Sequence, residues 1–289
     1  MKQKKIAWIT DSTIYMDKEF LERNNIHVVP LYVIFNDQCY KEEVEITVPE
    51  FFEKLHASDV FPKTSQPAIG DFVALYEKLK EEYDCGIAIH VSSGISGTFQ
   101  TSKMAAEMTG FDVEVIDSWM GSFPMACMFA EGIKLEQEGK SRDEIAQYLR
   151  TIPPHIRCNV VVENLELLHR GGRVSGTQYF LGSMLQIKPI VGFVDKQIVQ
   201  IEKVRKSKKA KKRIVELFEQ EVGPNDSVQL SIIHIANDEE ANEWKSELQE
   251  RFPQYHIHIS YLGPLIGVHT GEGVIGLTWY KTDKPFVLE

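Results

Sequence analysis

Short apolar runs alternate with helical stretches in the first half of the chain. Three compact apolar runs predict buried strands, at 6–10, 85–91 and 113–116. The stretch 26–35 is predicted as a further strand, followed by a hairpin at Asn36-Asp37 and, later, by a polar turn at 63–67. Helices are predicted over 17–24, 71–82, 101–108 and 122–138, and capping boxes predict helix starts at Thr47 and Ser141. Strands that alternate with helices favour a mostly parallel sheet with helices on both faces.

The second half of the chain has a different pattern. Strands at 187–194 and 197–204 are joined by Asp195-Lys196, which predicts a hairpin. Further strands are predicted at 159–162, 228–236, 256–261 and 274–280, and helices at 176–185, 208–222 and 238–251. Residues 263–273 are predicted to form a glycine-rich loop. We expect a mixed or antiparallel sheet with helices on one face, and Pro153-Pro154 places a domain boundary between 1–154 and 155–289.

Composition limits the class of protein. The chain has 289 residues, of which 43% are hydrophobic and 26% charged, as in ordinary globular proteins. No apolar run approaches the ~18 residues of a membrane span. The N-terminal lysines lead directly into a strand without a signal-peptide core, so we expect a cytoplasmic protein without stable membrane insertion. The net charge of −10 argues against general nucleic-acid binding.

The four cysteines are widely spaced and form no CxxC pair. They are expected to be reduced core thiols, and no stretch has the spacing of a metal site. We therefore predict neither a metal nor a cofactor.

The most informative stretch runs from Ser92 to Thr98, between a predicted strand and a predicted helix. It is rich in glycine and hydroxyl side chains, among them Ser93 and Ser96. Free backbone N–H groups at a helix N-terminus attract anions, and hydroxyls add donors. Two other strands also end in hydroxyl residues, at Thr10-Asp11-Ser12 and Asp117-Ser118. Ligands of open α/β sheets bind beyond the carboxyl ends of the strands, so an anion site is predicted there.

Known catalytic loops do not match this stretch. It lacks the Gly-Lys-Ser/Thr of a phosphate-binding Walker loop, and Thr98 stands where a GxSxG nucleophile elbow has its last glycine. A serine nucleophile at Ser96 would need a base, for which His269 is the best candidate. A serine hydrolase remains an alternative, and so does a capped turn without a ligand.

Basic residues form two further features. Arg170 and Arg173 flank two glycines, which suits either phosphate or carboxylate recognition or a helix end with solvated arginines. Residues 203–213 carry eight basic residues, which form either a solvated helix start or a docking face. His269 lies between glycines and is either ligand-facing or structural, whereas His90 at a strand end is expected to be structural.

Seven motifs together resemble the DegV family of bacterial lipid-binding proteins, which includes the fatty-acid-binding subunits of bacterial fatty acid kinase. They occur in the family's order over essentially the whole chain: Thr10-Asp11-Ser12, Thr64-Ser65-Gln66-Pro67, Ser92 to Thr98, Asp117-Ser118, Arg170-Gly171-Gly172-Arg173, Lys188-Pro189-Ile190 and Gly267 to Gly271. The resemblance implies an N-terminal α/β domain, a C-terminal domain with helices on its sheet, and one bound long-chain fatty acid. It also implies a separate ATP-binding kinase subunit that phosphorylates the carboxylate, so this chain would itself have no catalytic residues.

The resemblance also implies roles for individual residues. The carboxylate would be bound by Thr64, Ser65, Ser93, Ser96, Gly97, His269 and Thr270. Docking of the kinase, or phosphoryl transfer, would involve Arg170, Arg173, Arg205 and His269. The second half supplies apolar residues for the tail: Tyr179, Phe180, Leu181, Met184, Leu185 and Ile187.

The chain departs from the family within 119–128. After Asp117-Ser118 the family usually has small residues and a Gln-Gly pair, whereas this chain has bulky residues from Trp119 to Met125. The departure bears on the shape of the pocket and therefore on acyl-chain preference. A stand-alone serine esterase or thioesterase and a lipid-responsive regulatory protein remain the alternatives.

Overall fold

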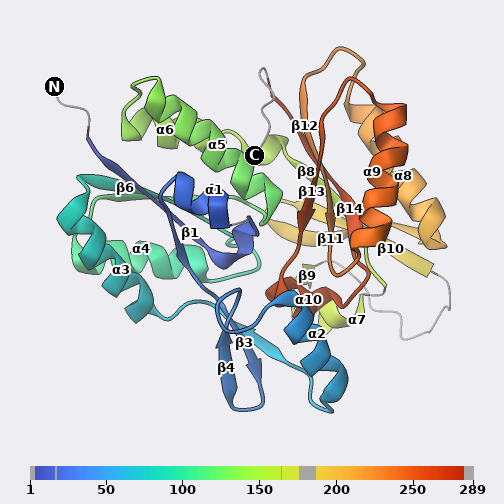
Figure 1. The fold of residues 1–289 in the computed structure, drawn as a ribbon, viewed down its shortest axis with the longest axis horizontal. Helices are drawn as coiled ribbons and strands as arrows, with labels where there is room; N and C mark the ends of the chain where they lie inside the picture. The colour runs from blue at the N-terminus through green and yellow to red at the C-terminus, as the bar shows by residue number, and fades with distance from the viewer. Residues whose placement is uncertain (1–3, 17, 164, 176–186, 283–289) are drawn as a thin grey trace.

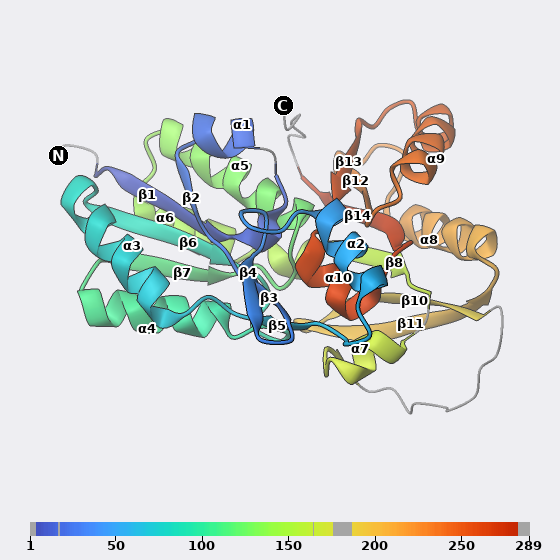
Figure 2. The same cartoon turned by 60° about the horizontal axis from the view of Figure 1, so that its bottom comes forward.

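The computed structural model of the chain describes residues 4–16, 18–163, 165–175 and 187–282. A four-stranded parallel sheet and a seven-stranded mixed sheet stand next to each other, and a small three-stranded sheet lies below the junction between them (Figures 1 and 2). The helix predicted at 176–185, with the tail residues assigned to it, lies outside the described residues.

The parallel sheet has the order β2-β1-β6-β7. Its strands are β1 (Ile6–Asp11), β2 (Ile26–Val29), β6 (Cys85–His90) and β7 (Val113–Asp117). Successive side chains of a strand point to opposite faces. Ala7 and Ile9 pack against α3 (Ile69–Glu82) and α4 (Thr98–Thr109), whereas Ile6 and Trp8 pack against α5 (Phe123–Gln137) and α6 (Arg142–Leu149). The predicted three-layer α/β/α arrangement is confirmed.

The mixed sheet has the order β13-β12-β14-β8-β10-β11-β9. Its strands are β8 (Arg157–Val161), β9 (Val174–Ser175), β10 (Ile187–Val194), β11 (Gln197–Arg205), β12 (Val228–His234), β13 (Ile257–Tyr261) and β14 (Ile275–Lys281). The pairs β12–β13 and β11–β9 are parallel, and the other neighbours are antiparallel. Helices α8 (Ser207–Glu221) and α9 (Asp238–Arg251) cover one face (Figure 1). The predicted mixed sheet and its helical layer are confirmed.

The other face of the mixed sheet is covered by parts of both halves of the chain. The three-stranded sheet has the order β4-β3-β5, from β3 (Tyr32–Phe35), β4 (Gln38–Lys41) and β5 (Lys63–Ser65). With α2 (Val48–Ala57), α7 (Glu166–Arg170) and α10 (Pro264–Thr270) it shares one hydrophobic core, in which Phe35 and Phe51 meet Val191 and Val274 of the mixed-sheet half. Short helices complete the fold: η1 (Ser12–Ile14), α1 (Lys18–Arg23) and η2 (Pro153–His155).

The strands of the parallel sheet all come before residue 118, and those of the mixed sheet all come after residue 156. A domain division at 154 stays a prediction.

Three sequence-based predictions of local structure are wrong. The stretch 26–35 is not one strand, because Pro30 separates β2 from β3 and the two belong to different sheets. The polar turn at 63–67 contains the strand β5, which pairs with β3. The glycine-rich loop at 263–273 contains the helix α10, which has Pro264 in its first turn. A Cβ at Gly267 would come within 2.8 Å of Phe51 Cε1, so this glycine lets α10 approach α2.

Candidate functional site

The carboxyl ends of β1 and β6 are joined by a buried polar network. Asp11 accepts hydrogen bonds from the backbone N–H groups of Thr13 (3.1 Å) and Val91 (3.0 Å), and its carboxylate lies 3.0 Å from His90 Nδ1. His90 Nε2 lies 2.8 Å from Ser102 Oγ. This Ser-His-Asp chain resembles a catalytic triad, but all three residues are 0% exposed. It ties β1 and β6 to α4, which is a structural role.

The predicted anion-binding loop connects the two large sheets. Ser92 Oγ donates to the carbonyl of Lys196 at the tip of the β10–β11 hairpin (2.7 Å), and Lys196 Nζ pairs with Asp117 (3.0 Å). Ser93 donates to Asp117 through both its N–H and its hydroxyl. Ser96 Oγ lies 2.9 Å from Thr98 Oγ1. The donors of Ser93 are therefore engaged by a carboxylate of the chain itself. The Ser96 hydroxyl bonds Thr98, and the Ser96 N–H donates to the carbonyl of Ser92 (3.1 Å).

Thr64 and His269 come together although 205 positions separate them. Thr64 Oγ1 on β5 lies 2.9 Å from His269 Nε2 on α10. Helices α7 and α10 and strand β5 lie beside one another (Figure 2). A Cβ at Gly171 would overlap His269 Nδ1, so this glycine lets the end of α7 approach the imidazole. Burial, and next the nearby Arg173, lower the pKa of His269 to about 4, so the imidazole is neutral at pH 7.

Arg173 links this group to the anion-binding loop. Its Nε donates to the carbonyl of Ile95 (3.3 Å) and its Nη1 to the carbonyl of Gly171 (2.5 Å). We define the head-group cluster as Thr64, Ser96, Arg173 and His269. Thr64 bonds His269, and Arg173 bonds the carbonyl of Ile95, the neighbour of Ser96. The cluster thus groups one cation, one neutral imidazole and two hydroxyls from four separate segments, which is a setting suited to a carboxylate.

An apolar cavity of about 80 Å³ lies between the carboxyl ends of the parallel strands and the mixed sheet. Strands β8, β10, β11 and β12 form one wall, and the segments after β1, β6 and β7 form the other. It is lined by Tyr15, Val91, Ile95, Met120, Gly121, Ser122, Cys158, Val160, Leu168, Val191, Gly192, Phe193, Ile198, Ile233, Leu262, Ile266, Thr270 and Val274. Pockets for small molecules usually measure about 300–1,000 Å³, so a long acyl chain requires this tail cavity to widen.

The segment that departs from the family is part of the cavity wall. Met120, Gly121 and Ser122 all line the tail cavity. Methionine is unbranched and adapts its shape easily, so Met120 is a wall residue that can move to admit a chain.

Helix α10 contributes neighbouring residues to the tail cavity and to the head-group cluster. Thr270 lines the cavity, and its neighbour His269 bonds Thr64 in the cluster. An amphiphile with one carboxylate and an apolar tail would match this succession of polar and apolar surface.

Three other predicted site residues, Ser65, Gly97 and Arg170, have contacts with residues outside the head-group cluster. Ser65 is exposed and donates to the carbonyl of Gln66 (3.0 Å). Gly97 is the N-cap of α4, and a Cβ there would overlap the Gln66 side chain. Arg170 is exposed and stacks on the ring of Phe61 at 4.6 Å.

Arg205 is not brought to the cluster. It is the last residue of β11, opposite Ile187, whereas β9, which follows Arg173, pairs with β11 at Ile198. Arg205 therefore lies roughly 20 Å along the strand from that point, at about 3.3 Å per residue. Its role in docking stays a prediction.

The geometry does not assemble the esterase site. A nucleophile and its base must lie within hydrogen-bond reach. His269 bonds Thr64, and the hydroxyl of Ser96 bonds Thr98. No observation therefore favours Ser96 as a nucleophile.

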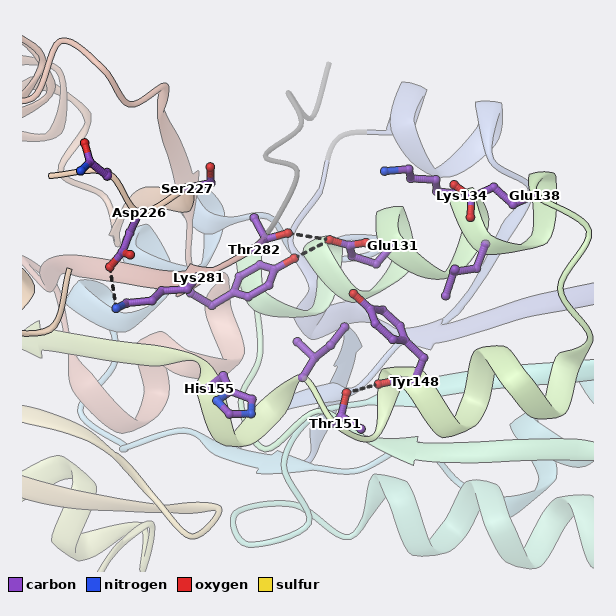
Figure 3. Close-up of a pocket in the computed structure, with 14 residues that line it drawn as sticks. Glu131, Lys134, Glu138, Tyr148, Thr151, His155, Asp226, Ser227, Lys281 and Thr282 are labelled. Carbon is purple, nitrogen blue, oxygen red and sulfur yellow. Dashed lines mark hydrogen bonds and ion pairs between the residues drawn. The ribbon is translucent and has the colours of Figure 1, made fainter. Parts of the chain in front are cut away.

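A larger groove of about 640 Å³ lies between α5, the end of α6 and the end of β14 (Figure 3). Its lining is polar: Glu131 accepts from Tyr280 Oη (2.9 Å) and Thr282 Oγ1 (3.2 Å), and Asp226 pairs with Lys281 (2.5 Å). None of the predicted site residues lines it.

The described residues contain neither a candidate metal site nor a candidate membrane-spanning helix. No group of three or more His, Cys, Asp or Glu side chains in this part of the chain is placed to hold a metal ion. None of the described helices is both long and apolar enough to cross a membrane.

Comparison with known proteins gives consistent results over the whole chain. The sequence profile of the DegV family, described as a family of uncharacterised proteins, matches residues 5–282. A DegV domain-containing protein of Listeria innocua is 41% identical over 277 residues, which cover 95% of this chain and 98% of that protein. Protein DegV of Bacillus subtilis is 40% identical over 276 residues, with the same coverage.

Solved structures agree. DegV of Bacillus subtilis, a fatty acid binding protein, superimposes with a TM-score of 0.89 at 39% identity, covering 97% of this chain and 100% of that one. A fatty-acid-binding DegV family protein of Thermus thermophilus gives 0.88 at 30% identity, covering 96% and 100%.

Proposed function

This chain belongs to the DegV family, and on that basis we propose that it binds one long-chain fatty acid, with the carboxylate at the head-group cluster and the tail in the cavity. The observation that carries the proposal is the junction at His269 and Thr270. One of these neighbours bonds Thr64 beside the cation Arg173, and the other lines the apolar cavity. The two solved structures described above are of fatty-acid-binding proteins, which supports the same ligand here.

The finer part of the proposal is that the chain presents the carboxylate to a separate ATP-dependent kinase subunit, which forms the acyl phosphate. Two features support it. The head-group cluster lies at the edge of the cavity, with Arg173 half-buried and Arg170 exposed nearby. A guanidinium group suits phosphate as well as carboxylate, so Arg173 can serve both docking and transfer.

The test of fatty acid binding is mass spectrometry of the denatured, purified protein. We expect one long-chain fatty acid at near one per chain. Several preparations that contain no lipid and take up neither oleate nor palmitate would overturn the proposal.

The partner is tested by co-purification with a fatty acid kinase and by acyl-phosphate formation. A regulatory protein without a partner would form neither a complex nor a product. An esterase would instead hydrolyse acyl esters without ATP and would lose that activity in Ser96→Ala.

A further inference from the structure

Glu42 is a fully buried carboxylate at the junction between the halves of the fold. It follows β4 and is 0% exposed. Its Oε1 accepts hydrogen bonds from Tyr15 Oη (2.9 Å) and from the backbone N–H of Leu265 (2.7 Å). Its Oε2 accepts from Ser12 Oγ (2.5 Å). One side chain thus connects the segment after β1 with the first turn of α10.

Both connected segments belong to the proposed binding site. Tyr15 lines the tail cavity. Leu265 is in the first turn of α10, whose later residues Ile266 and Thr270 also line the cavity and whose His269 belongs to the head-group cluster. Glu42 itself touches neither the cavity nor the cluster, so any effect it has on the ligand must act through α10 and Tyr15.

The residue before α10 shows how closely these segments are packed. A Cβ at Gly263 would overlap the ring of Tyr15 and come within 2.9 Å of Glu42 Oε1. Gly263 lies at φ −84°, in ordinary extended backbone, so the glycine is required here by space and not by conformation. Glu42 therefore holds the start of α10 where the backbone of Gly263 packs directly against Tyr15.

We propose that Glu42 is the positioning residue of the fatty acid site: its carboxylate holds the start of α10 against Tyr15 and so sets how tightly helix and cavity wall close on the ligand. The proposal rests on the proposed binding of a fatty acid. It goes beyond that function by assigning control of ligand release to a residue that does not touch the ligand.

The charge of Glu42 supports a pH-dependent effect. Burial raises the pKa of Glu42 to about 7, against hydrogen bonds from Ser12, Leu265 and Tyr15 that lower it, and nearby Glu43 raises it further. Burial, and next the Glu42 charge, raise the pKa of Tyr15 well above its usual range, with Glu43 and Asp11 adding to the effect. Between pH 6 and 8, Glu42 therefore changes charge while Tyr15 stays protonated.

Ionisation strengthens the tie to α10. A charged carboxylate accepts a stronger hydrogen bond from the Leu265 N–H than a neutral one does. The helix should therefore be held more firmly at pH 8 than at pH 6, and the ligand should leave more slowly. His269 does not contribute in this range, because its pKa is about 4. Burial also raises the pKa of Glu43, so Glu43→Gln belongs among the controls.

The test is the rate at which preloaded, radiolabelled oleate passes to excess phosphatidylcholine vesicles at pH 6 and pH 8. The quantity compared between proteins is the ratio of the release rate at pH 6 to the release rate at pH 8. Titration of oleate itself changes this ratio equally in all variants. We expect this ratio to be roughly tenfold larger in the wild type than in Glu42→Gln, as the loss of one charge-assisted bond implies. Glu42→Gln preserves volume and one acceptor, so it is expected to fold.

Glu131→Gln is the matched control. Glu131 is also a buried glutamate that accepts from a tyrosine hydroxyl, but it ties α5 to β14 in the polar groove (Figure 3) and does not line the tail cavity. Its ratio should equal that of the wild type, and Glu43→Gln should keep the larger ratio.

Two results would overturn different claims, one the positioning role of Glu42 and the other the binding of a fatty acid. Equal release rates in wild type and Glu42→Gln at pH 8, with or without a lower melting temperature in the variant, would overturn the positioning role. A wild-type protein that takes up no oleate would overturn the proposed function itself.

Discussion

Thr64→Val separates the contributions of head group and tail to fatty acid binding. Valine has the shape of threonine and is equally favourable in a strand, so β5 should keep its pairing with β3. The substitution removes the hydroxyl that lies 2.9 Å from His269 Nε2. It therefore withdraws one hydrogen-bonding group from the head-group cluster without altering the cavity.

The buried tail contributes more to the free energy of binding than one hydrogen bond to the head group. A hydrogen bond to a charged group contributes about 1.5–3 kcal/mol, so its loss should weaken binding ~10–100-fold. Burial contributes about 0.8 kcal/mol per CH₂, so a long chain gives on the order of 10 kcal/mol before ordering costs. Thr64→Val should therefore still purify with fatty acid. Phosphoryl transfer should fall by more than occupancy, because a loosely held carboxylate no longer points at the incoming phosphate.

The assay compares the affinities of palmitate and decanoate for the wild type and Thr64→Val. Decanoate has six CH₂ groups fewer, which should cost roughly 5 kcal/mol in either protein. Because head group and tail bind at separate places, the two effects should add. Thr109→Val is a suitable control, since the hydroxyl of Thr109 donates to the carbonyl of Ala105 (2.9 Å) and accepts from the N–H of Phe111 (3.3 Å), at the end of α4.

Two results would refute this reasoning. One is complete loss of palmitate from Thr64→Val in a protein that remains folded. The other is an equal affinity for palmitate and decanoate, which would mean that the tail is not buried.

Three further predictions follow from the site. Arg173→Ala should keep its lipid but lower acyl-phosphate formation with the kinase, and Arg205→Ala should leave lipid occupancy unchanged; loss of lipid with normal transfer would reverse the roles. The pKa of His269 is lowered to about 4, so between pH 4 and 6.5 the unfolded chain binds more protons than the folded chain. The contribution of His269 to the free energy of unfolding is therefore fully present above pH 6.5. It is lost, by up to about 3 kcal/mol, as the pH falls through 4. Urea unfolding of wild type and His269→Gln across this range measures it, and identical pH profiles would contradict it. Gly171→Ala should push the imidazole from Thr64 and weaken oleate binding, whereas Gly70→Ala, where nothing lies within 4 Å, should bind oleate as the wild type does; equal affinities would show that the contact is unimportant.

Much of the fold is visible in the sequence because it depends on local patterns. The apolar runs correctly predicted β1, β6 and β7. The capping boxes at Thr47 and Ser141 correctly predicted where α2 and α6 begin. The errors arose where the local pattern was ambiguous. Val29 and Leu31 are apolar on both sides of Pro30, so two strands resembled one. The glycines at 263, 267 and 271 concealed α10, because Gly263 and Gly267 allow close packing and Gly271 ends the helix at a φ of +77°.

The site was predictable in its residue types but not in its pairings. The sequence singled out Thr64 and His269 separately, yet nothing local shows that residues 205 positions apart meet at 2.9 Å. The cavity wall was missed because Val160, Val191 and Ile233 have the same apolar pattern as residues of the solid core. Glu42 was missed too, since a glutamate in a polar hairpin usually faces solvent. Only the contact of this residue, which follows β4, with the first turn of α10 reveals that it is buried.

The central claim is that the tail of a fatty acid lies in the cavity between the sheets with its carboxylate at the head-group cluster. A crystal structure of the protein with bound palmitate tests it most directly. We predict an acyl chain enclosed by Met120, Phe193 and Ile198, in a cavity wider than the present 80 Å³, with a carboxylate oxygen within hydrogen-bond distance of Thr64 Oγ1. A chain bound in the groove beside Glu131, or a carboxylate that points away from Thr64 and Arg173, would contradict the account.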